Sequence, residues 1–362
     1  MCQSVIAKQH LQRRVTEMKI TTIGLDLAKN VFQVHGVDDR GKTVLTRQLR
    51  RQQMPSFFAK LEPCLIGMEA CSGAHFWARV LRSFGHEVKL MAPQFVKPYV
   101  KANKTDAADA EAISEAVTRP NMRFVPVKTV DQQAVLSLHR ARSGFVKART
   151  ALVNKIRGLL SEYGVVLAPG IRQVRAGVPS IVEDAELDLP PMFRQLLSQL
   201  YQYLCQLDDQ VQSIEQPLKN WHRSSVDSQR LEQVPGIGWL TATALVASIG
   251  DATSFKNGRQ LAAWLGLVPR QHSSGGKPRL LGISKRGDAY LRTLIIHGAR
   301  AAIRVVDRDR SPTGQWVREV SKRRPKNVVV VARANKQARI VWALLAHQRD
   351  YDALHTPVRQ AA

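Results

Sequence analysis

The sequence predicts an N-terminal α/β domain, a coiled-coil middle segment and a mainly helical C-terminal domain. Three features lead to this prediction. Short β-rich runs alternate with helical runs over residues 19–127, apolar residues follow heptad spacing over 128–226, and the helices expected over 227–345 are strongly basic. Residues 1–18 are interpreted as a basic extension, with Met18 as a hypothetical native start, and residues 346–362 as a tail.

The first domain is expected to begin with a three-strand meander and to continue with alternating helices and strands. Its strands are expected over residues 20–27, 31–35, 43–45, 64–69 and 87–91. Its helices are expected over residues 54–61 and 74–84 and from about residue 105 onward. This order is typical of a ribonuclease H-like α/β domain.

Two apolar stripes define the middle segment. Residues 138, 145, 152 and 159 recur every seven positions, and nine apolar residues from Phe193 to Trp221 alternate steps of four and three. Spacing does not identify the partner helix, so a helical hairpin within one chain and a dimerisation arm both stay open. Pro217 lies within the second stripe and is expected to kink or end that helix.

The charge balance favours a polyanionic partner. The chain carries 54 Lys and Arg against 29 Asp and Glu, a formal net charge of +25, and 18 basic but only 4 acidic residues lie between Arg270 and Ile340. Such a one-sided excess indicates contacts with nucleic-acid phosphates. The sequence shows no secretory signal, long apolar span or cationic surface helix, so no membrane partner is expected. The four cysteines lack metal-ligand spacing and are expected to be free thiols.

Four carboxylates of the first domain are candidates for a metal site. Asp26 lies in an apolar strand, where its charge needs compensation, and Glu69 closes the fourth strand. Asp106 and Asp109 share one face of a first helical turn, with Thr105 as the expected N-cap. Acids at a first turn also simply complement the helix dipole. If the four converge, oxygen ligands of this kind suit Mg²⁺ or Mn²⁺ and in-line displacement at phosphorus.

A turn in the basic region is a candidate contact with DNA. Residues 233–242 have an apolar-Pro-Gly-apolar-Gly turn before a helix with small residues, the pattern of a helix-hairpin-helix. Gly236, Ile237 and Gly238 are expected to offer backbone N–H groups to a DNA phosphate. An ordinary glycine-rich connection is the alternative.

A second glycine-rich loop carries Ser273 and Ser274 among cations. Cations hold a phosphate beside a serine, so nucleophilic attack by either serine is chemically reasonable, although Ser-Gly-Gly loops are also common connectors. The cations expected to bind DNA here are Arg270, Lys277, Arg279, Lys285 and Arg286.

In the joint order of these motifs the sequence resembles the DEDD insertion-sequence transposases. Relatives of that family include the Piv-type pilin-gene invertases and the bridge-RNA-guided recombinases. The resemblance covers nearly the whole chain, from about residue 20 to residue 345. It depends on residues 24–29, 67–69, 104–110, 235–238 and 273–277.

The resemblance implies a RuvC-like N-terminal domain in which Asp26, Glu69, Asp106 and Asp109 bind Mg²⁺. It also implies a C-terminal serine that becomes linked to a DNA 5′-phosphate, for which Ser274, directly before the glycine, is the better match. A dimer or tetramer with an active site composed from two protomers is implied too, as is a structured noncoding guide RNA. On this interpretation the protein is a DNA transposase that acts in the cytoplasm, at the bacterial nucleoid.

Three other interpretations were weighed. A Holliday-junction resolvase would use metal-activated water and no covalent link, which the serine loop and the third domain argue against. A non-enzymatic nucleic-acid-binding protein would not need all four acids. An actin-like ATPase needs a second glycine-rich phosphate loop, which the sequence lacks.

Overall fold

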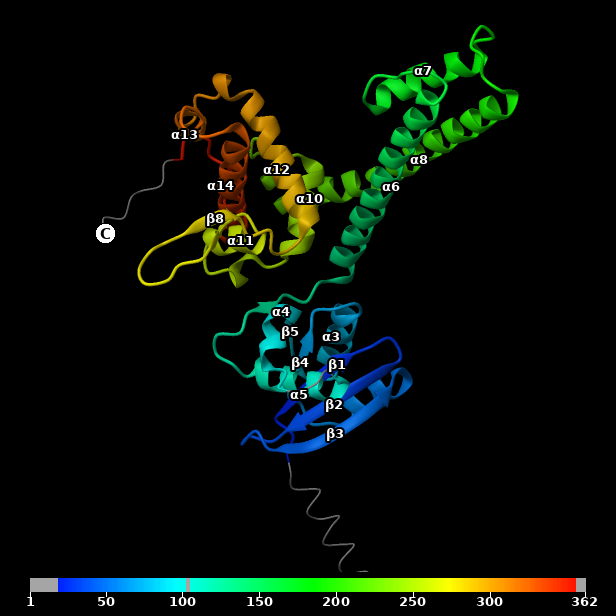
Figure 1. The fold of residues 1–362 in the computed structure, drawn as a ribbon. Coiled ribbons are helices and arrows are strands. Elements are labelled where there is room, and N and C mark those ends of the chain that lie inside the picture. Colours follow the sequence, from blue (N-terminus) through cyan, green and yellow to red (C-terminus); the bar gives the residue numbers. More distant parts are fainter. Residues whose placement is uncertain (1–18, 102–104, 356–362) are drawn as a thin grey trace, which may run out of the picture. The chain divides into compact units, whose positions relative to one another are not determined.

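Figure 1 shows the computed structural model, which describes residues 19–101 and 105–355. The chain divides into two compact units, residues 1–129 (unit 1) and residues 130–362 (unit 2). The predicted basic extension with its hypothetical start at Met18, and residues 356–362 of the tail, lie outside the described residues.

Unit 1 is built on a mixed sheet of six strands in the order β3-β2-β1-β4-β5-β6. β1, β4 and β5 are parallel to one another, whereas β2, β3 and β6 join by antiparallel pairing. The strands are β1 (Thr22–Leu27), β2 (Val31–Val37), β3 (Thr43–Arg50), β4 (Leu65–Glu69), β5 (Glu87–Met91) and β6 (Phe124–Val125). The predicted mixed α/β arrangement, a meander followed by alternating helices and strands, is confirmed.

The helices of unit 1 differ from expectation mainly in length. They are α2 (Met54–Phe58), α3 (Ala74–Ser83), α4 (Pro93–Val96) and α5 (Asp106–Val117), with 3₁₀ turns at Arg51–Gln53 and Lys97–Tyr99. The edge strand β3 continues to Arg50, beyond the predicted 43–45, because it pairs along the whole of β2 while most of its polar side chains stay in solvent.

Helix α5 lies directly on the sheet at two glycines. A Cβ added at Gly24 of β1 would collide with the backbone of Ala110 and Ser114, and one added at Gly67 of β4 would meet the Val117 side chain at 2.8 Å. Side chains alternate between the two faces of a strand, so Leu25 points to the other face, where it packs in one core with Trp77 of α3. The sheet is therefore covered by α5 on one face and by α3 on the other.

Unit 2 begins with two long helices packed against each other, α6 (Val130–Ser161) and α8 (Pro191–Ser224), with α7 (Ile171–Glu183) at one end (Figure 1). Most of the two apolar stripes packs in one core, other stripe residues pack in a second core with Ala247 of a later helix, and the ion pair of Arg142 with Glu215 (2.7 Å) joins α6 and α8. Within one chain, α6 and α8 therefore form a helical hairpin, and a role of this hairpin as a dimerisation arm stays a prediction. Contrary to one of the expectations for Pro217, α8 does not end there but continues to Ser224.

The rest of unit 2 is mainly helical, as predicted. Its helices are α9 (Val226–Glu232), α10 (Trp239–Ile249), α11 (Gly258–Trp264), α12 (Ala289–Arg304), α13 (Pro312–Ser321) and α14 (Lys326–Ala346), with 3₁₀ turns at Ala252–Ser254 and Val306–Arg308. The predicted glycine-rich loop is the tip of a β-hairpin of β7 (Pro269–Gln271) and β8 (Leu280–Ile283), two strands that the sequence did not indicate. None of the helices described is both long and apolar enough to span a membrane.

Candidate active site and nucleic-acid surface

Asp26 and Glu69 stand at the ends of two adjacent parallel strands. Leu25 of β1 pairs with Met68 of β4, and each acid is the next residue along its strand. Both side chains are half-buried. Adjacent parallel strands end at the same edge of a sheet, so the two carboxylates come from neighbouring positions, as the sequence predicted.

The two acids also project from the same face of the sheet. Each lies two residues after a glycine that contacts α5, and residues two apart in a strand point to the same side. Asp26 follows Gly24 in this way, and Glu69 follows Gly67. The repeated Gly-x-acid spacing is a sequence signal for this common face that the motif analysis did not use.

The Cys71 thiol lies in the negative field of Asp26 and Glu69. The pKa of its thiol is raised above the ordinary value, first by burial and then by the negative charges of Glu69 and Asp26. Both carboxylates therefore act on one point directly after β4. Sequence reasoning treated Cys71 only as a free thiol, and it is free in the structure. A shared negative field at half-buried oxygen ligands suits a divalent cation.

Asp106 and Asp109 lie in the first turn of α5, the helix that covers this face. The predicted cap is confirmed, because the Thr105 hydroxyl accepts a hydrogen bond from the N–H of Ala108 (3.2 Å). Asp106 is exposed and Asp109 is half-buried, one residue before the Ala110 carbonyl that touches β1. The helix that carries both aspartates therefore packs on the face from which Asp26 and Glu69 project.

The four acids do not form a closed cluster in this structure. Among the residues described, no group of three or more His, Cys, Asp or Glu side chains has an arrangement suited to a metal ion. Carboxylates brought together repel one another unless a cation neutralises them. The convergence of all four therefore stays a prediction, whereas the neighbouring strand ends of Asp26 and Glu69 are observed.

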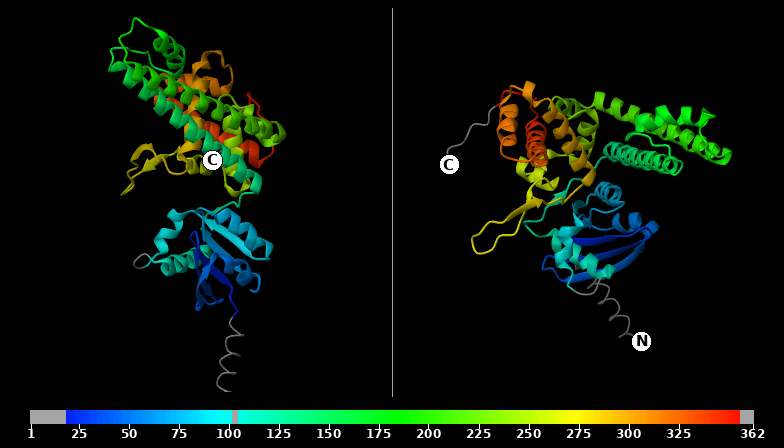
Figure 2. Two further views of the ribbon diagram at one scale, coloured as in Figure 1. Left: turned by 90° about the vertical axis from the view of Figure 1, so that its right-hand side faces the viewer. Right: turned by 45° about the horizontal axis from the view of Figure 1, so that its top comes forward.

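The two candidate serines lie at the tip of the β7–β8 hairpin, which projects from the helices of unit 2 (Figure 2). Ser274 and Lys277 flank a two-residue turn, with the Lys277 N–H bonded to the Ser274 carbonyl (3.1 Å). The turn residues Gly275 and Gly276 have φ of 56° and 74°, a left-handed conformation that glycine adopts without strain. The segment is therefore an ordered hairpin tip rather than an irregular connection.

The hydrogen bonds of the hairpin distinguish the two serines. The Ser273 hydroxyl accepts hydrogen bonds from the Gln271 side-chain amide (2.8 Å) and from the Arg279 N–H (3.3 Å). The Ser274 hydroxyl is exposed and has no hydrogen bond with any residue that the structure describes. Ser273 thus helps to hold the hairpin, whereas the Ser274 hydroxyl is not engaged in holding it.

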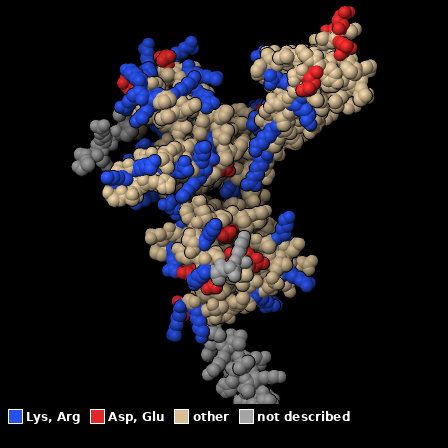
Figure 3. Space-filling model, in the orientation of Figure 1, with Lys and Arg blue, Asp and Glu red and all other residues tan. Residues whose placement is uncertain are grey.

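The hairpin carries exposed cations, and Figure 3 shows a further gathering of Lys and Arg side chains over the part of unit 2 that carries α12 and α13. The base of the hairpin is anchored, because the Lys285 N–H bonds to the Gly266 carbonyl (3.1 Å) and Arg292 donates to the carbonyls of Leu265 (3.2 Å) and Arg286 (3.1 Å). The predicted DNA-binding cations are all exposed: Arg270, Lys277, Arg279, Lys285 and Arg286.

The Pro-Gly-Ile-Gly turn joins α9 to α10, and its residues differ in accessibility. Ile237 belongs to the core, and Gly236, with φ of 90°, is packed so tightly against the Gly298 carbonyl that a Cβ would not fit. Gly238 is the exposed member. The Ile237 N–H is already bonded to the Val234 carbonyl (2.8 Å), and of the three predicted residues Gly238 is the one that is exposed at the surface.

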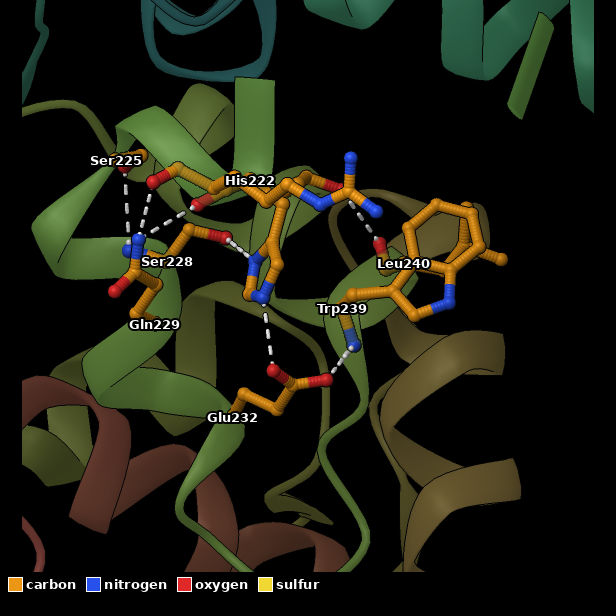
Figure 4. Close-up of polar contacts among 9 residues, drawn as sticks. His222, Ser225, Ser228, Gln229, Glu232, Trp239 and Leu240 are labelled. Atoms are coloured by element: carbon orange, nitrogen blue, oxygen red, sulfur yellow. Dashed lines mark hydrogen bonds and ion pairs between the residues drawn. The ribbon is translucent and has the colours of Figure 1, made fainter. Parts of the chain in front are cut away.

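A carboxylate already caps the helix after this turn. Figure 4 shows Glu232 accepting a hydrogen bond from the Trp239 N–H (3.1 Å) through one oxygen and contacting His222 Nε2 (2.8 Å) through the other. His222 Nδ1 contacts the Ser228 hydroxyl at 2.7 Å. Ser228 is fully buried, so this Ser-His-Glu order stabilises the turn and does not present a nucleophile to a substrate. Motif analysis missed the network because its members have no characteristic spacing.

Two family models of transposases match parts of this chain. A family model described as transposase, for DEDD enzymes of the IS110 type, matches residues 23–165, and a model described as transposase IS116/IS110/IS902 family matches residues 228–313. The first match includes all four candidate acids, and the second includes the Pro-Gly-Ile-Gly turn and both serines.

Several transposases are similar over almost the whole chain. A "Probable family 20 transposase" of Pseudomonas aeruginosa is 53% identical over 92% of this chain and 99% of its own length. The transposase for insertion sequence element IS1111A of Coxiella burnetii is 46% identical over 96% of this chain and 97% of its own. The pilin gene-inverting protein of Moraxella bovis is 26% identical over 92% of this chain and 98% of its own.

Proposed function

Because the chain belongs to the IS116/IS110/IS902 family of transposases, we propose that this DNA transposase cuts and rejoins strands through a covalent serine–phosphate intermediate at Ser274. The observation that carries the proposal is the Ser274 hydroxyl, exposed at an ordered hairpin tip among cations. In this position a DNA phosphate is held by positive charge beside an unengaged nucleophile.

The proposed step conserves atoms and charge. Ser274 Oγ attacks a DNA phosphorus and loses its proton, the new Oγ–P bond forms, and the bond from phosphorus to the 3′ oxygen breaks. The 3′ oxygen takes up a proton and leaves as a hydroxyl, while the 5′-phosphate stays on the serine. Attack by another 3′ hydroxyl reverses the step, restores Ser274 and joins the strands.

A DEDD-type transposase domain indicates the use of a divalent metal ion, and we assign this role to Mg²⁺, with Mn²⁺ as a substitute. The residues fit such an ion, because Asp26 and Glu69 offer half-buried carboxylates with a shared negative field at Cys71. Asp106 and Asp109 would complete the ligand set from α5. Such an ion, held by these carboxylates, would supply positive charge that offsets the negative charge of a DNA phosphate.

The proposal includes the partners that the family resemblance implies. Gly238 and the hairpin cations would contact the DNA backbone, the turn serving as a helix-hairpin-helix. Unit 1 would be a ribonuclease H-like, RuvC-like domain. The active assembly would contain two or four copies together with a structured noncoding guide RNA.

The test uses labelled element-junction DNA incubated with the protein, its co-purifying RNA and Mg²⁺. We expect a protein–DNA adduct that survives denaturation and that fails to form when the metal is chelated. Cleaved DNA without any adduct would contradict the serine intermediate and would favour direct hydrolysis of the resolvase type.

A further inference from the structure

A cavity of about 310 Å³ lies in unit 2 next to the Pro-Gly-Ile-Gly turn. Its apolar wall comes from the end of α12, the following segment and Val317 of α13, and Pro235 of the turn closes one side. Its charged lining consists of Arg308, Arg310 and Arg333 with a single acid, Asp309. No residue of the β7–β8 hairpin and none of the four candidate acids lines this cavity.

Arg333 of α14 is the unusual member, because only 2% of its surface is exposed. Its Nη2 donates a long hydrogen bond to the Pro235 carbonyl (3.4 Å), which already accepts a shorter one from the Gln337 amide (2.7 Å). Its Nη1 is buried without a hydrogen-bond partner among the residues described. A buried guanidinium with an unsatisfied donor is costly unless an anion or other acceptor completes it.

The electrostatics agree with this geometry. Burial lowers the pKa of Arg333, and the negative charges that Tyr351 and Asp309 carry when ionised oppose that shift. The Asp309 carboxylate is also engaged locally, since it accepts a hydrogen bond from the Ser311 N–H (2.9 Å). No ion pair joins Asp309 to Arg333 within the described part of the chain. The positive charge of the lining is therefore only partly compensated.

The walls of the cavity are held in place without a ligand. Arg318 of α13 donates from Nη1 to the carbonyls of Val306 and Asp309, both at 2.7 Å, and so fixes the segment that carries Arg308 and Arg310. On the opposite side, Gly236 is wedged against α12 and α14. A site formed in advance loses little conformational entropy when it binds its ligand.

We propose that this cavity binds a backbone phosphate of a nucleic-acid strand, with Arg333 donating from its floor and Arg308 and Arg310 from its exposed rim. The inference deepens the proposed function, on which it rests, by adding a phosphate contact beside the turn. A phosphate oxyanion has the charge and acceptor geometry that a guanidinium satisfies with paired hydrogen bonds. The apolar wall leaves space for the attached sugar.

The first test titrates inorganic phosphate into the full-length protein at constant ionic strength and follows the thermal unfolding midpoint. Phosphate should raise the midpoint of wild type saturably. The paired change Arg308→Gln and Arg310→Gln should weaken phosphate binding about tenfold, as should Arg333→Gln. The matched control Arg323→Gln and Arg324→Gln removes two exposed charges near α13 but outside the cavity, and should bind phosphate as wild type does. Equal responses in all variants, or none in wild type, would overturn the site.

The second test measures the affinity of the same variants for duplex DNA and for RNA, because either strand could supply the phosphate. The cavity pair should lose about tenfold more affinity than the control pair for at least one of them, with a shallower salt dependence. Phosphate binding without that difference would indicate a free anion only and overturn the assignment to a strand. Both tests are independent of Ser274, so failure of the serine adduct in wild type would overturn the proposed chemistry alone.

Discussion

The backbone of Ala110 lies so close to Gly24 that no side chain fits between α5 and the first strand. This contact sets the height of the helix above the sheet. Because Asp109 precedes Ala110 and Asp26 follows Gly24 by two residues, it also sets how closely the two groups of acids approach. Both the packing of α5 on the sheet and the spacing of the candidate acids therefore depend on the lack of a side chain at Gly24.

Substitution Gly24→Ala should lift α5 from the sheet and cost about 1–3 kcal/mol of unit 1 stability, because the added methyl overpacks a backbone contact. Hydrogen exchange of amides in β1 and α5 should accelerate, and strand cleavage should fall. The control Gly144→Ala lies in the exposed part of α6 with nothing within 4 Å of the new methyl, and should leave exchange in unit 1 unchanged. Unaltered exchange in Gly24→Ala would show that α5 is not held by this contact.

Neutralising either strand-end acid should abolish cleavage while sparing DNA binding. Asp26→Asn and Glu69→Gln keep side-chain size but remove the charge that a divalent ion requires. The control Glu87→Gln makes the same change on β5 of the same sheet, at an exposed position that begins its strand. Cleavage at the wild-type rate by either site variant would overturn the metal assignment.

Cys71 provides a measurement of the same field that does not depend on catalysis. Its pKa is raised by burial and by Glu69 and Asp26, so removing either charge should lower that pKa and increase the thiolate fraction near pH 8. Alkylation of Cys71 by iodoacetamide should therefore accelerate in Asp26→Asn and Glu69→Gln, and also in wild type when Mg²⁺ binds. The exposed Cys205 in unit 2 supplies the internal reference. Unchanged Cys71 rates in all three cases would contradict a carboxylate pair acting on this thiol.

His139 should make unit 2 sensitive to acid. Its Nε2 contacts the Thr243 hydroxyl and its Nδ1 the Tyr290 hydroxyl, both at 3.0 Å. Because Thr243 donates to the Leu240 carbonyl (3.1 Å), its oxygen accepts from Nε2. In the neutral ring, Nδ1 then accepts from the Tyr290 hydroxyl. Burial first, and then the charge of Arg142, lowers the His139 pKa from 6.5 to about 4.

The depressed pKa fixes the direction of the pH effect. The unfolded chain protonates His139 near pH 6.5 and the folded one only near pH 4, so acid favours unfolding. Stability should be full above pH 6.5 and should fall by up to about 3 kcal/mol as pH drops to about 4. Denaturation of His139→Gln should depend less on pH over this range, whereas the exposed-site control His297→Gln should behave as wild type. An equal slope in wild type and His139→Gln would refute this assignment.

Much of unit 1 could be predicted because its signals are local. The alternation of strands and helices, the Thr105 cap and the strand-end positions of Asp26 and Glu69 all follow from short stretches of sequence. The common face of the acids could also have been predicted from the Gly-x-acid spacing in both strands. Whether the four acids converge on one ion could not be predicted from the sequence, because it depends on the position of α5 and on neutralisation of their charges.

In unit 2 the contacts between distant segments could not be predicted from the sequence. A heptad stripe predicts a buried helix face but not its partner, which only packing identified as the other helix of the same chain. The Gly275-Gly276 pair signals a tight turn, but its flanking strands are too short to show alternation. Arg333 is one basic residue among many in the sequence, and its burial comes from the meeting of distant segments.

Adduct formation by serine variants shows directly whether Ser274 is the nucleophile. Wild type, Ser273→Ala and Ser274→Ala should be incubated with labelled junction DNA, co-purifying RNA and Mg²⁺ and then denatured. We expect an adduct with wild type and a reduced amount with Ser273→Ala, because Ser273 helps to hold the hairpin. Ser274→Ala should bind DNA but form no adduct, and an undiminished adduct in that variant would show that Ser274 is not the nucleophile.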